Sequence, residues 1–338
     1  MIKIELSDEK REKIEKIFLE DLVEGTSRDK RQGKEGKLIE DLNNCRPLLV
    51  GGRTNPAPYH FWQLAQYLYD GMGKPNIANV KALLLADRKR MEMFAGQFGP
   101  FPIKETNELL DKVFRYTNFS NRKVVNEILR EMEVPVCPYC NRLYITALKR
   151  KKVRPQLDHF FPKSKYPYLA LCLYNLIPSC GVCNQAKSDL DPLDSRYPSL
   201  LYPYEEEFGE DVVFALKLKG QDDFVRKMRG DSSKIQVYIN RSSSKLKTKV
   251  DQQVERLHLT ELYNEHGDYV ADILKSYYIN TEARVAELLQ CFPDLFTTRD
   301  EVRSLMFMSD ISRERWGKRP LAKLTHDICL ELDNLPTT

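Results

Sequence analysis

Two Cys-x-x-Cys pairs constrain what this chain can fold into more than any other feature. In a chain of 338 residues, Cys137-Pro-Tyr-Cys140 and Cys180-Gly-Val-Cys183 are separated by 39 residues. Each pair makes a tight turn that presents two thiolates to one cation, and two such turns complete a tetrahedral shell of four sulfur atoms. Soft sulfur ligands favour zinc, and less often iron, over magnesium. Because four thiolates leave no position for water, the spacing predicts a structural metal site.

Other interpretations of these cysteines remain open. A redox-active Cys-x-x-Cys occurs singly after a strand of a βαβ unit, and cysteines can also be buried at such a spacing by chance. A zinc deaminase is excluded, because its signature needs His-x-Glu ahead of the cysteines and here the nearby His159 follows the first pair. The remaining cysteines have no partner at this spacing and are expected to be ordinary buried thiols: Cys45, Cys172, Cys291 and Cys329.

Composition narrows the class of protein. With 42% hydrophobic and 30% charged residues, the chain is expected to be globular, and a collagen-like or wholly disordered chain is excluded. The net charge is only +4, so contact with nucleic acid must come from a local basic patch. The apolar run Tyr168–Ile177 is too short to cross a bilayer, and Met1–Glu5 lacks an apolar signal core. We therefore expect a cytoplasmic protein without membrane contact, whose cysteines are reduced or bound to metal.

The chain is long enough for two or three domains. Residues 1–133 show helical periodicity, and residues 134–200 form a cysteine-bearing module. Residues 201–338 are mostly helical again, apart from a short hairpin whose strands are expected at Val212–Lys217 and Lys234–Ile239. Ser7 is the expected N-cap of the first helix, and a later helix is expected over Ile77–Phe94. The last helix is expected to bury the apolar stripe of Leu321, Leu324, Ile328 and Leu332. This pattern predicts an α+β fold that is mostly helical.

The segment between the cysteine pairs carries a series of landmarks in a fixed order. After the first pair come Asp158-His159, then Pro162-Lys163-Ser164, then Asn175-Leu176, and the second pair runs on as Cys183-Asn184-Gln-Ala-Lys187. In this order the landmarks resemble the HNH (ββα-metal) endonucleases whose finger carries two zinc knuckles. The resemblance covers residues 137–187. It implies a zinc-stapled ββα-metal finger between helical segments, and hydrolysis of phosphodiester bonds in nucleic acid, most simply double-stranded DNA.

The resemblance also implies roles for individual residues. His159 would be the general base, while Asp158 and Asn184 would bind the catalytic Mg²⁺ or Mn²⁺; many family members have histidine where Asn184 stands. Asn175 would hold the loop that carries His159 through hydrogen bonds from its side chain to the backbone. These residue types suit the chemistry, because neutral histidine can deprotonate water and oxygen ligands suit hard cations. A structural histidine and a simple turn asparagine are the alternatives for His159 and Asn175.

The sequence raises one geometric difficulty. Adjacent residues of a strand point to opposite faces. Asp158 and His159 can therefore share a site only where their strand bends or ends, and Pro162, which cannot continue a sheet ladder, is placed to help.

A basic segment accompanies these landmarks. From Arg142 to Lys165 eight basic residues face one acid, Asp158, and four of them form the run Lys149–Lys152. We expect this run at the tip of a hairpin between strands near Leu143–Leu148 and Arg154–Phe160, where it would bind the nucleic-acid backbone. The residues expected to bind nucleic acid are Lys149, Arg150, Lys151, Lys152, Lys163 and Lys187. A solvated turn, and for Lys187 a solvated helix face, are the alternatives.

Outside the finger two segments show a weaker likeness. Arg256–His266 and Arg319–Ile328 are similar to segments of the nuclease subunits of Septu-type anti-phage systems, including Septu-like retron modules. In those systems the HNH protein works beside a separate ATPase, and the chain has no phosphate-binding loop of its own, since Gly51-Gly52-Arg53 lacks the Gly-Lys-Ser/Thr ending. The resemblance thus implies an ATPase partner. A non-catalytic zinc-knuckle module that binds nucleic acid or acts as an adaptor is the alternative function.

Overall fold

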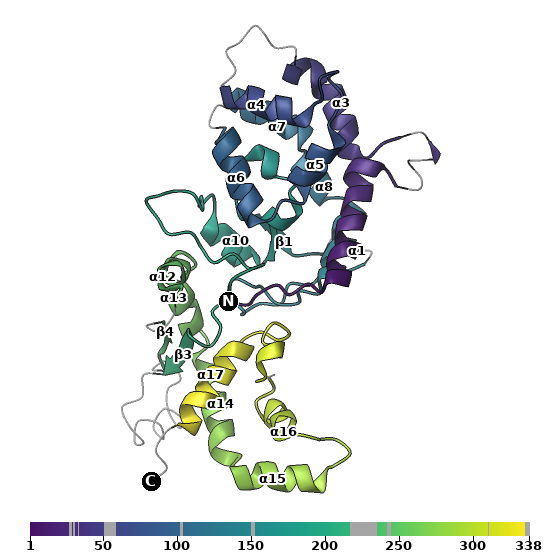
Figure 1. The fold of residues 1–338 in the computed structure, drawn as a ribbon. Helices are drawn as coiled ribbons and strands as arrows, with labels where there is room; N and C mark the ends of the chain where they lie inside the picture. Colours follow the sequence, from purple (N-terminus) through teal and green to yellow (C-terminus); the bar gives the residue numbers. More distant parts are fainter. Residues whose placement is uncertain are drawn as a thin grey trace. The chain divides into compact units, whose positions relative to one another are not determined.

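The structure, a computed structural model, is mostly helical with two small antiparallel sheets (Figure 1). The residues it describes are 1–26, 29, 31–32, 34–50, 59–101, 104–149, 153–216, 235–241, 245–309 and 311–334. The chain divides into two compact units: an N-terminal unit of Glu5–Glu133 and Thr146–Arg196, and a C-terminal unit of Met1–Ile4, Val134–Ile145 and Tyr197–Thr338. The mostly helical composition expected from the sequence is confirmed. None of the helices in the described ranges has both the length and the apolar character needed to span a bilayer.

The N-terminal unit is a group of helices around one short hairpin. Its helices are α1 (Asp8–Leu19), η1 (Glu20–Glu24), α3 (Lys37–Val50), α4 (Tyr59–Leu68), α5 (Ile77–Leu84), α6 (Arg88–Phe98), α7 (Lys104–Val113), α8 (Tyr116–Ser120), α9 (Lys123–Met132), η2 (Pro167–Leu169), η3 (Leu173–Asn175) and α10 (Gly181–Lys187). The expected start of the first helix is confirmed, because the Ser7 side chain accepts a hydrogen bond from the backbone N–H of Lys10.

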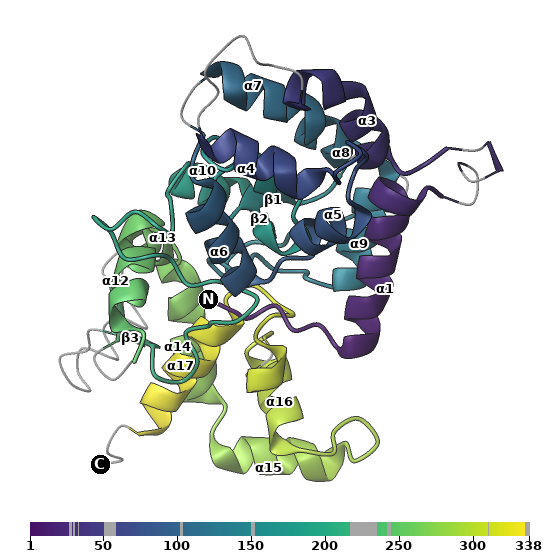
Figure 2. The same ribbon diagram turned by 45° about the horizontal axis from the view of Figure 1, so that its top comes forward.

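The hairpin of this unit consists of β1 (Gln156–His159) and β2 (Leu176–Ser179). The strands pair antiparallel, with Gln156 opposite Ser179 and His159 opposite Leu176. Both strands are almost entirely buried, and in Figure 1 and Figure 2 the helices α5, α6 and α8 lie near β1. Helix α10 begins directly after β2, with the Cys180 sulfur as the acceptor at its N-cap. This local order places the side chains at the end of β1 next to those of α10.

The expected partner strand of β1 is wrong. Leu143–Leu148 forms no strand. Instead, the backbone N–H of Cys137 donates to the carbonyl of Leu143, and that of Ile145 donates to the carbonyl of Pro135. The backbone groups that would pair with β1 thus close the turn around the first cysteine pair, so β1 pairs with β2. Lys149 is exposed, whereas Arg150, Lys151 and Lys152 lie outside the described residues.

The C-terminal unit contains the second sheet and the remaining long helices. Strands β3 (Val213–Leu216) and β4 (Val237–Asn240) pair antiparallel, which confirms the expected short hairpin. The helices are α12 (Lys247–Arg256), α13 (Leu259–Asn264), α14 (Gly267–Ile279), α15 (Glu282–Cys291), α16 (Arg299–Met306), η5 (Arg313–Arg315) and α17 (Ala322–Asp333). Helix α17 buries the apolar stripe expected from its period, because Leu324, Ile328 and Leu332 are at most 3% exposed.

Candidate functional site

The two cysteine pairs meet in one buried group. The sulfur atoms of Cys137, Cys140, Cys180 and Cys183 all lie within 4.8 Å of one another. A tetrahedral zinc ion with Zn–S bonds of about 2.3 Å holds its sulfurs about 3.8 Å apart, so the group fits such an ion. The four-cysteine group can therefore hold a zinc ion with four thiolate ligands. Of the other cysteines, Cys45, Cys172 and Cys329 are buried as expected, but Cys291, at the end of α15, is exposed.

Each cysteine turn is shaped by hydrogen bonds to its own sulfur and backbone atoms. The backbone N–H of Arg142 donates to the sulfur of Cys140, and the N–H of Cys183 donates to that of Cys180, both at 3.4 Å. Asn141 adopts a left-handed φ of 51°, which its short polar side chain tolerates. Such N–H donors orient sulfur ligands and stabilise their thiolate form.

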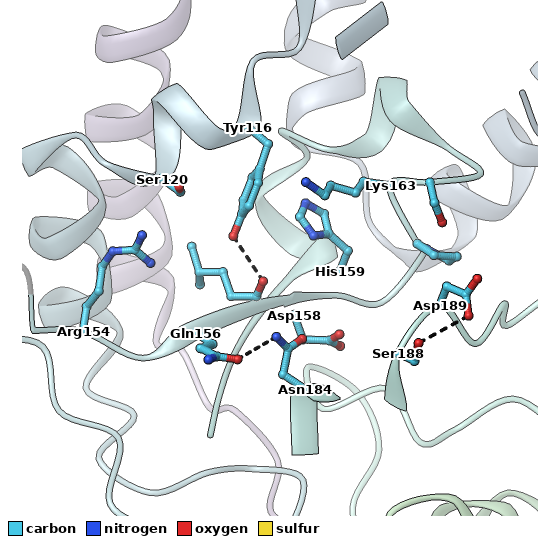
Figure 3. A pocket seen from close by; sticks show the side chains of 13 residues that line it. Tyr116, Ser120, Arg154, Gln156, Asp158, His159, Lys163, Asn184, Ser188 and Asp189 are labelled. Carbon is cyan, nitrogen blue, oxygen red and sulfur yellow. Dashed lines mark hydrogen bonds between the residues drawn. The ribbon is translucent and has the colours of Figure 1, made fainter. Parts of the chain in front are cut away.

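A pocket of about 520 Å³ lies in the N-terminal unit beside the β1–β2 hairpin. Four of the residues singled out in the sequence line it: Asp158, His159, Lys163 and Asn184. In Figure 3 the imidazole of His159 points toward Tyr116 and Lys163, whereas Asp158 points toward Asn184. The two neighbours therefore leave the strand in different directions and still reach one pocket. This is possible because β1 ends at His159.

His159 is a buried imidazole held from one side. Its Nε2 atom lies 3.1 Å from the carbonyl oxygen of Ala170. Since a carbonyl can only accept, Nε2 carries the proton, and Nδ1 is the basic atom of the neutral ring. Burial is the main cause that lowers the pKa of His159 to about 3; the hydrogen bond to Ala170 opposes this shift, and the charges of Lys163 and Lys187 add to it. The ring is neutral at physiological pH, as a general base must be.

Asp158 forms a buried ion pair with Lys187. The ammonium group of Lys187 lies 3.1 Å from Oδ1 of Asp158 and 2.6 Å from the carbonyl oxygen of His159, and the two side chains are 1% and 2% exposed. Helix α10 is thus fastened to β1 at both Asp158 and His159. The cation also compensates a carboxylate that is removed from water. Lys187 is thus buried against β1. Its contact with phosphate stays a prediction.

Asn175 makes the side-chain hydrogen bonds to the backbone that its proposed role requires. It accepts from the backbone N–H of Phe161 at 2.7 Å and donates to the carbonyls of Phe161 and Leu169 at 3.1 and 3.0 Å. The side chain is fully buried. Asn175 therefore links the segment just after His159 to the segment around Leu169 and Ala170. Ala170 is the hydrogen-bond partner of the imidazole.

Asn184 adds an amide to the pocket. Its Nδ2 donates to Oε1 of Gln156 at 2.7 Å, so the amide oxygen is the atom that a cation would meet. A carboxylate and an amide oxygen are ligands that Mg²⁺ and Mn²⁺ accept, with water and phosphate in the remaining positions. The donor types of Asp158 and Asn184 therefore fit a hard divalent cation.

The pocket also contains residues that the sequence did not single out as site residues. Tyr116 comes from α8, far upstream of the cysteine pairs, and Arg154 and Gln156 precede or begin β1. Arg154 belongs to the basic segment, so its charge was a usable signal. Tyr116 had none, because no sequence spacing relates α8 to β1.

Comparisons with known proteins found one partial likeness. No protein-family model matches the chain. A segment of 95 residues is 32% identical to the Septu protein PtuB of Bacillus thuringiensis. The likeness is to part of a Septu protein. It covers 28% of this chain and 34% of PtuB, so the chain spans about a third of the length of that curated relative. No solved structure matches.

Proposed function

We propose that the chain is a metal-dependent HNH-type endonuclease that hydrolyses phosphodiester bonds of nucleic acid, most simply DNA. The observation that carries the proposal is the pocket at the end of β1. There a neutral imidazole, whose Nε2–H is bound to a carbonyl, shares one wall with a carboxylate and an amide oxygen. The order of these residues relative to the two cysteine pairs resembles that of the zinc-knuckle HNH enzymes.

Each side chain of the pocket has a separate role in the proposed hydrolysis. Nδ1 of His159 accepts a proton from the attacking water, while the bond from Nε2 to Ala170 fixes the ring. Asp158 and Asn184 would hold the Mg²⁺ or Mn²⁺, which when bound neutralises charge on the phosphate and on the leaving oxygen. Lys187 keeps Asp158 in place, and Asn175 fixes the segment behind the base. The zinc held by the four cysteines would be structural.

The pocket carries two cations that suit a phosphate-bearing substrate, beside the carboxylates of Asp158 and Asp189. Lys163 and Arg154 line it, and Lys149 is exposed at the beginning of the basic run. Arginine and lysine contacts to phosphate carry no sequence information, so binding should depend on salt more than on base sequence. We infer a nuclease of low sequence specificity.

The likeness to PtuB supports a role in anti-phage defence. On this proposal the chain is the effector of a Septu-type system and works beside a separate ATPase subunit. On the same proposal, the partner would hold the nuclease idle until a trigger acts.

A cleavage assay tests the proposal. Zinc-loaded protein is incubated with supercoiled plasmid and, separately, with RNA, in Mg²⁺, Mn²⁺ or EDTA, with and without the proposed ATPase partner. We expect nicking of plasmid that requires Mg²⁺ or Mn²⁺ and is lost in His159→Ala. The matched control is His258→Asn, an exposed histidine at φ 51° that asparagine can replace without strain.

Two outcomes contradict the proposal. Equal cleavage by the wild type and His159→Ala would show that His159 is not the base. Salt-sensitive binding of DNA without cleavage in any metal, even with the partner present, would instead favour a zinc-knuckle binding or adaptor module.

A further inference from the structure

Tyr116 packs directly against the imidazole of His159. It begins α8 and stands 43 residues before His159 in the sequence. The centroids of the two rings are 4.3 Å apart, and the ring planes meet at 71° (Figure 3). This is the edge-to-face arrangement that aromatic rings prefer.

Two further contacts place the phenol ring between the strand and the loop that follows it. The hydroxyl group donates to the carbonyl oxygen of Leu157 at 3.2 Å, two residues before His159 on β1. On the other side, the ammonium group of Lys163 lies 5.0 Å from the centre of the Tyr116 ring. One side chain therefore touches the strand that carries the imidazole, the imidazole itself, and the loop beyond it.

Helix α8 is itself held by the core of the N-terminal unit. Phe119, three residues after Tyr116, is buried, and its ring meets that of Phe18 in α1 at 5.6 Å and 88°. Arg115, just before α8, lies 3.7 Å from the carboxylate of Asp41 in α3. The position of Tyr116 is thus fixed by packing that does not involve the β1–β2 hairpin.

We propose that Tyr116 is a positioning residue, which fixes the orientation of the His159 ring so that Nε2 stays on Ala170 and Nδ1 faces the pocket. A single hydrogen bond leaves the imidazole free to tilt about that bond, and the tyrosine ring blocks the tilt. The inference rests on the proposed function only where it gives His159 the role of base. It extends the active site beyond the cysteine-flanked segment to a helix of the N-terminal region.

The ring contact carries this role, and the hydroxyl group of Tyr116 adds a secondary anchor on β1. Burial is the main cause that raises the pKa of Tyr116 to about 12; the charge of Arg154 opposes this shift, and that of Asp158 adds to it. Its hydroxyl group therefore stays protonated at physiological pH and continues to donate to Leu157.

A spectroscopic measurement tests the contact without requiring activity. The chain has 5 histidines, so long-range ¹H–¹⁵N spectra of the histidine-labelled protein can resolve each ring. We expect the wild type and Tyr116→Phe to show a single Nε2–H tautomer for His159, and Tyr116→Leu to show a tautomer mixture or exchange broadening. Tyr238→Leu, an exposed tyrosine on β4, is the matched control and should leave the signal unchanged. An unchanged His159 signal in Tyr116→Leu would overturn the proposal.

Kinetics separate positioning from substrate binding. In Tyr116→Leu we expect kcat for Mg²⁺-dependent cleavage to fall about tenfold or more, with the KM for DNA unchanged, because the base is misplaced and the phosphate contacts remain. Tyr116→Phe should stay within about twofold of the wild type. A rise in KM at constant kcat would show that Tyr116 stacks on the substrate, which contradicts the proposal.

Stability is measured alongside, through zinc content and the unfolding temperature. If Tyr116→Leu folds poorly, Tyr116→Met, which keeps more of the side-chain length, takes its place in both experiments. Failure of the two proposals is distinguishable. If the His159 tautomer depends on Tyr116 but His159→Ala keeps full activity, the positioning contact stands and the proposed role of His159 as the base is wrong.

Discussion

Two buried lysine–aspartate pairs in this protein are alike in burial and differ in what they touch. In the N-terminal unit, Lys187 lies 3.1 Å from Asp158, and both side chains are at most 2% exposed. In the C-terminal unit, Lys323 lies 2.9 Å from Asp327, four residues on in the same helix, and both are at most 3% exposed. Each pair meets the requirement that a buried charge have a partner.

The surroundings of the pairs give them different tasks. Asp327 also accepts from the backbone N–H of Phe214, and the ammonium group of Lys323 lies 4.4 Å from the centre of the Trp316 ring, so this pair ties α17 to β3 and η5. Asp158 lines the 520 Å³ pocket, and Lys187 also binds the carbonyl of His159. Burial and pairing alone therefore do not distinguish the two carboxylates; Asp158 differs from Asp327 because it lines a pocket together with His159.

The largest difference between the pairs should appear in activity. We expect Asp158→Asn to lower kcat for Mg²⁺-dependent cleavage about 10³-fold, because a ligand charge worth several kcal/mol to the transition state is lost. Asparagine keeps the shape of the side chain and can still accept from Lys187. Asp327→Asn should leave kcat per folded molecule within about twofold, since that carboxylate has a structural task. Equal losses of kcat in the two variants would contradict the distinction.

The Lys323–Asp327 pair should matter more for stability than for activity. Asp327→Asn leaves Lys323 buried without a counter-charge, and we expect the free energy of unfolding, measured in urea, to fall by about 3 kcal/mol. The double variant Lys323→Met/Asp327→Leu replaces both charges by apolar groups and should recover most of that loss. If Asp327→Asn is as stable as the wild type, the pair contributes little to the free energy of unfolding.

Lys187→Met tests the task of the lysine itself. We expect kcat to fall about tenfold, because β1 loses its fastening at the His159 carbonyl, while the Mg²⁺ concentration for half-maximal activity decreases, because a competing cation is removed from Asp158. The KM for DNA should not change. A higher KM with an unchanged requirement for Mg²⁺ would instead support direct contact between Lys187 and phosphate.

The smallest effect is expected for the exposed cation of the same pocket. Lys163→Met should raise the KM for DNA a few-fold and reduce the slope of log K against log salt by about one, with kcat nearly unchanged. Binding measured at several salt concentrations gives the slope directly. An unchanged slope would mean that Lys163 does not contact phosphate.

Local rules predicted the features that depend on near neighbours in the sequence. The cysteine spacing predicted the buried sulfur group, and the apolar period predicted the buried face of α17. The landmark order predicted the hydrogen bonds of Asn175 to the backbone. Each of these follows from a spacing within one segment, or from a motif whose geometry is recurrent.

Features that depend on distant partners were missed. The expected strand Leu143–Leu148 gives its backbone hydrogen bonds to the first cysteine turn, and alternation of side chains cannot reveal that competition. The helix expected over Ile77–Phe94 is divided, because Asp87 caps the start of α6 through the N–H of Arg90. Tyr116 reaches His159 only through the tertiary packing of α8, which no spacing encodes.

Metal binding tests the central claim most directly, since it does not depend on a partner that triggers activity. The account predicts one zinc per chain after purification, and one Mn²⁺ bound in addition, seen by electron paramagnetic resonance. The Mn²⁺ should be lost in Asp158→Asn, and the zinc should be lost in Cys180→Ser. Mn²⁺ binding that is indifferent to Asp158→Asn, or a wild-type protein that folds without zinc, would contradict the account.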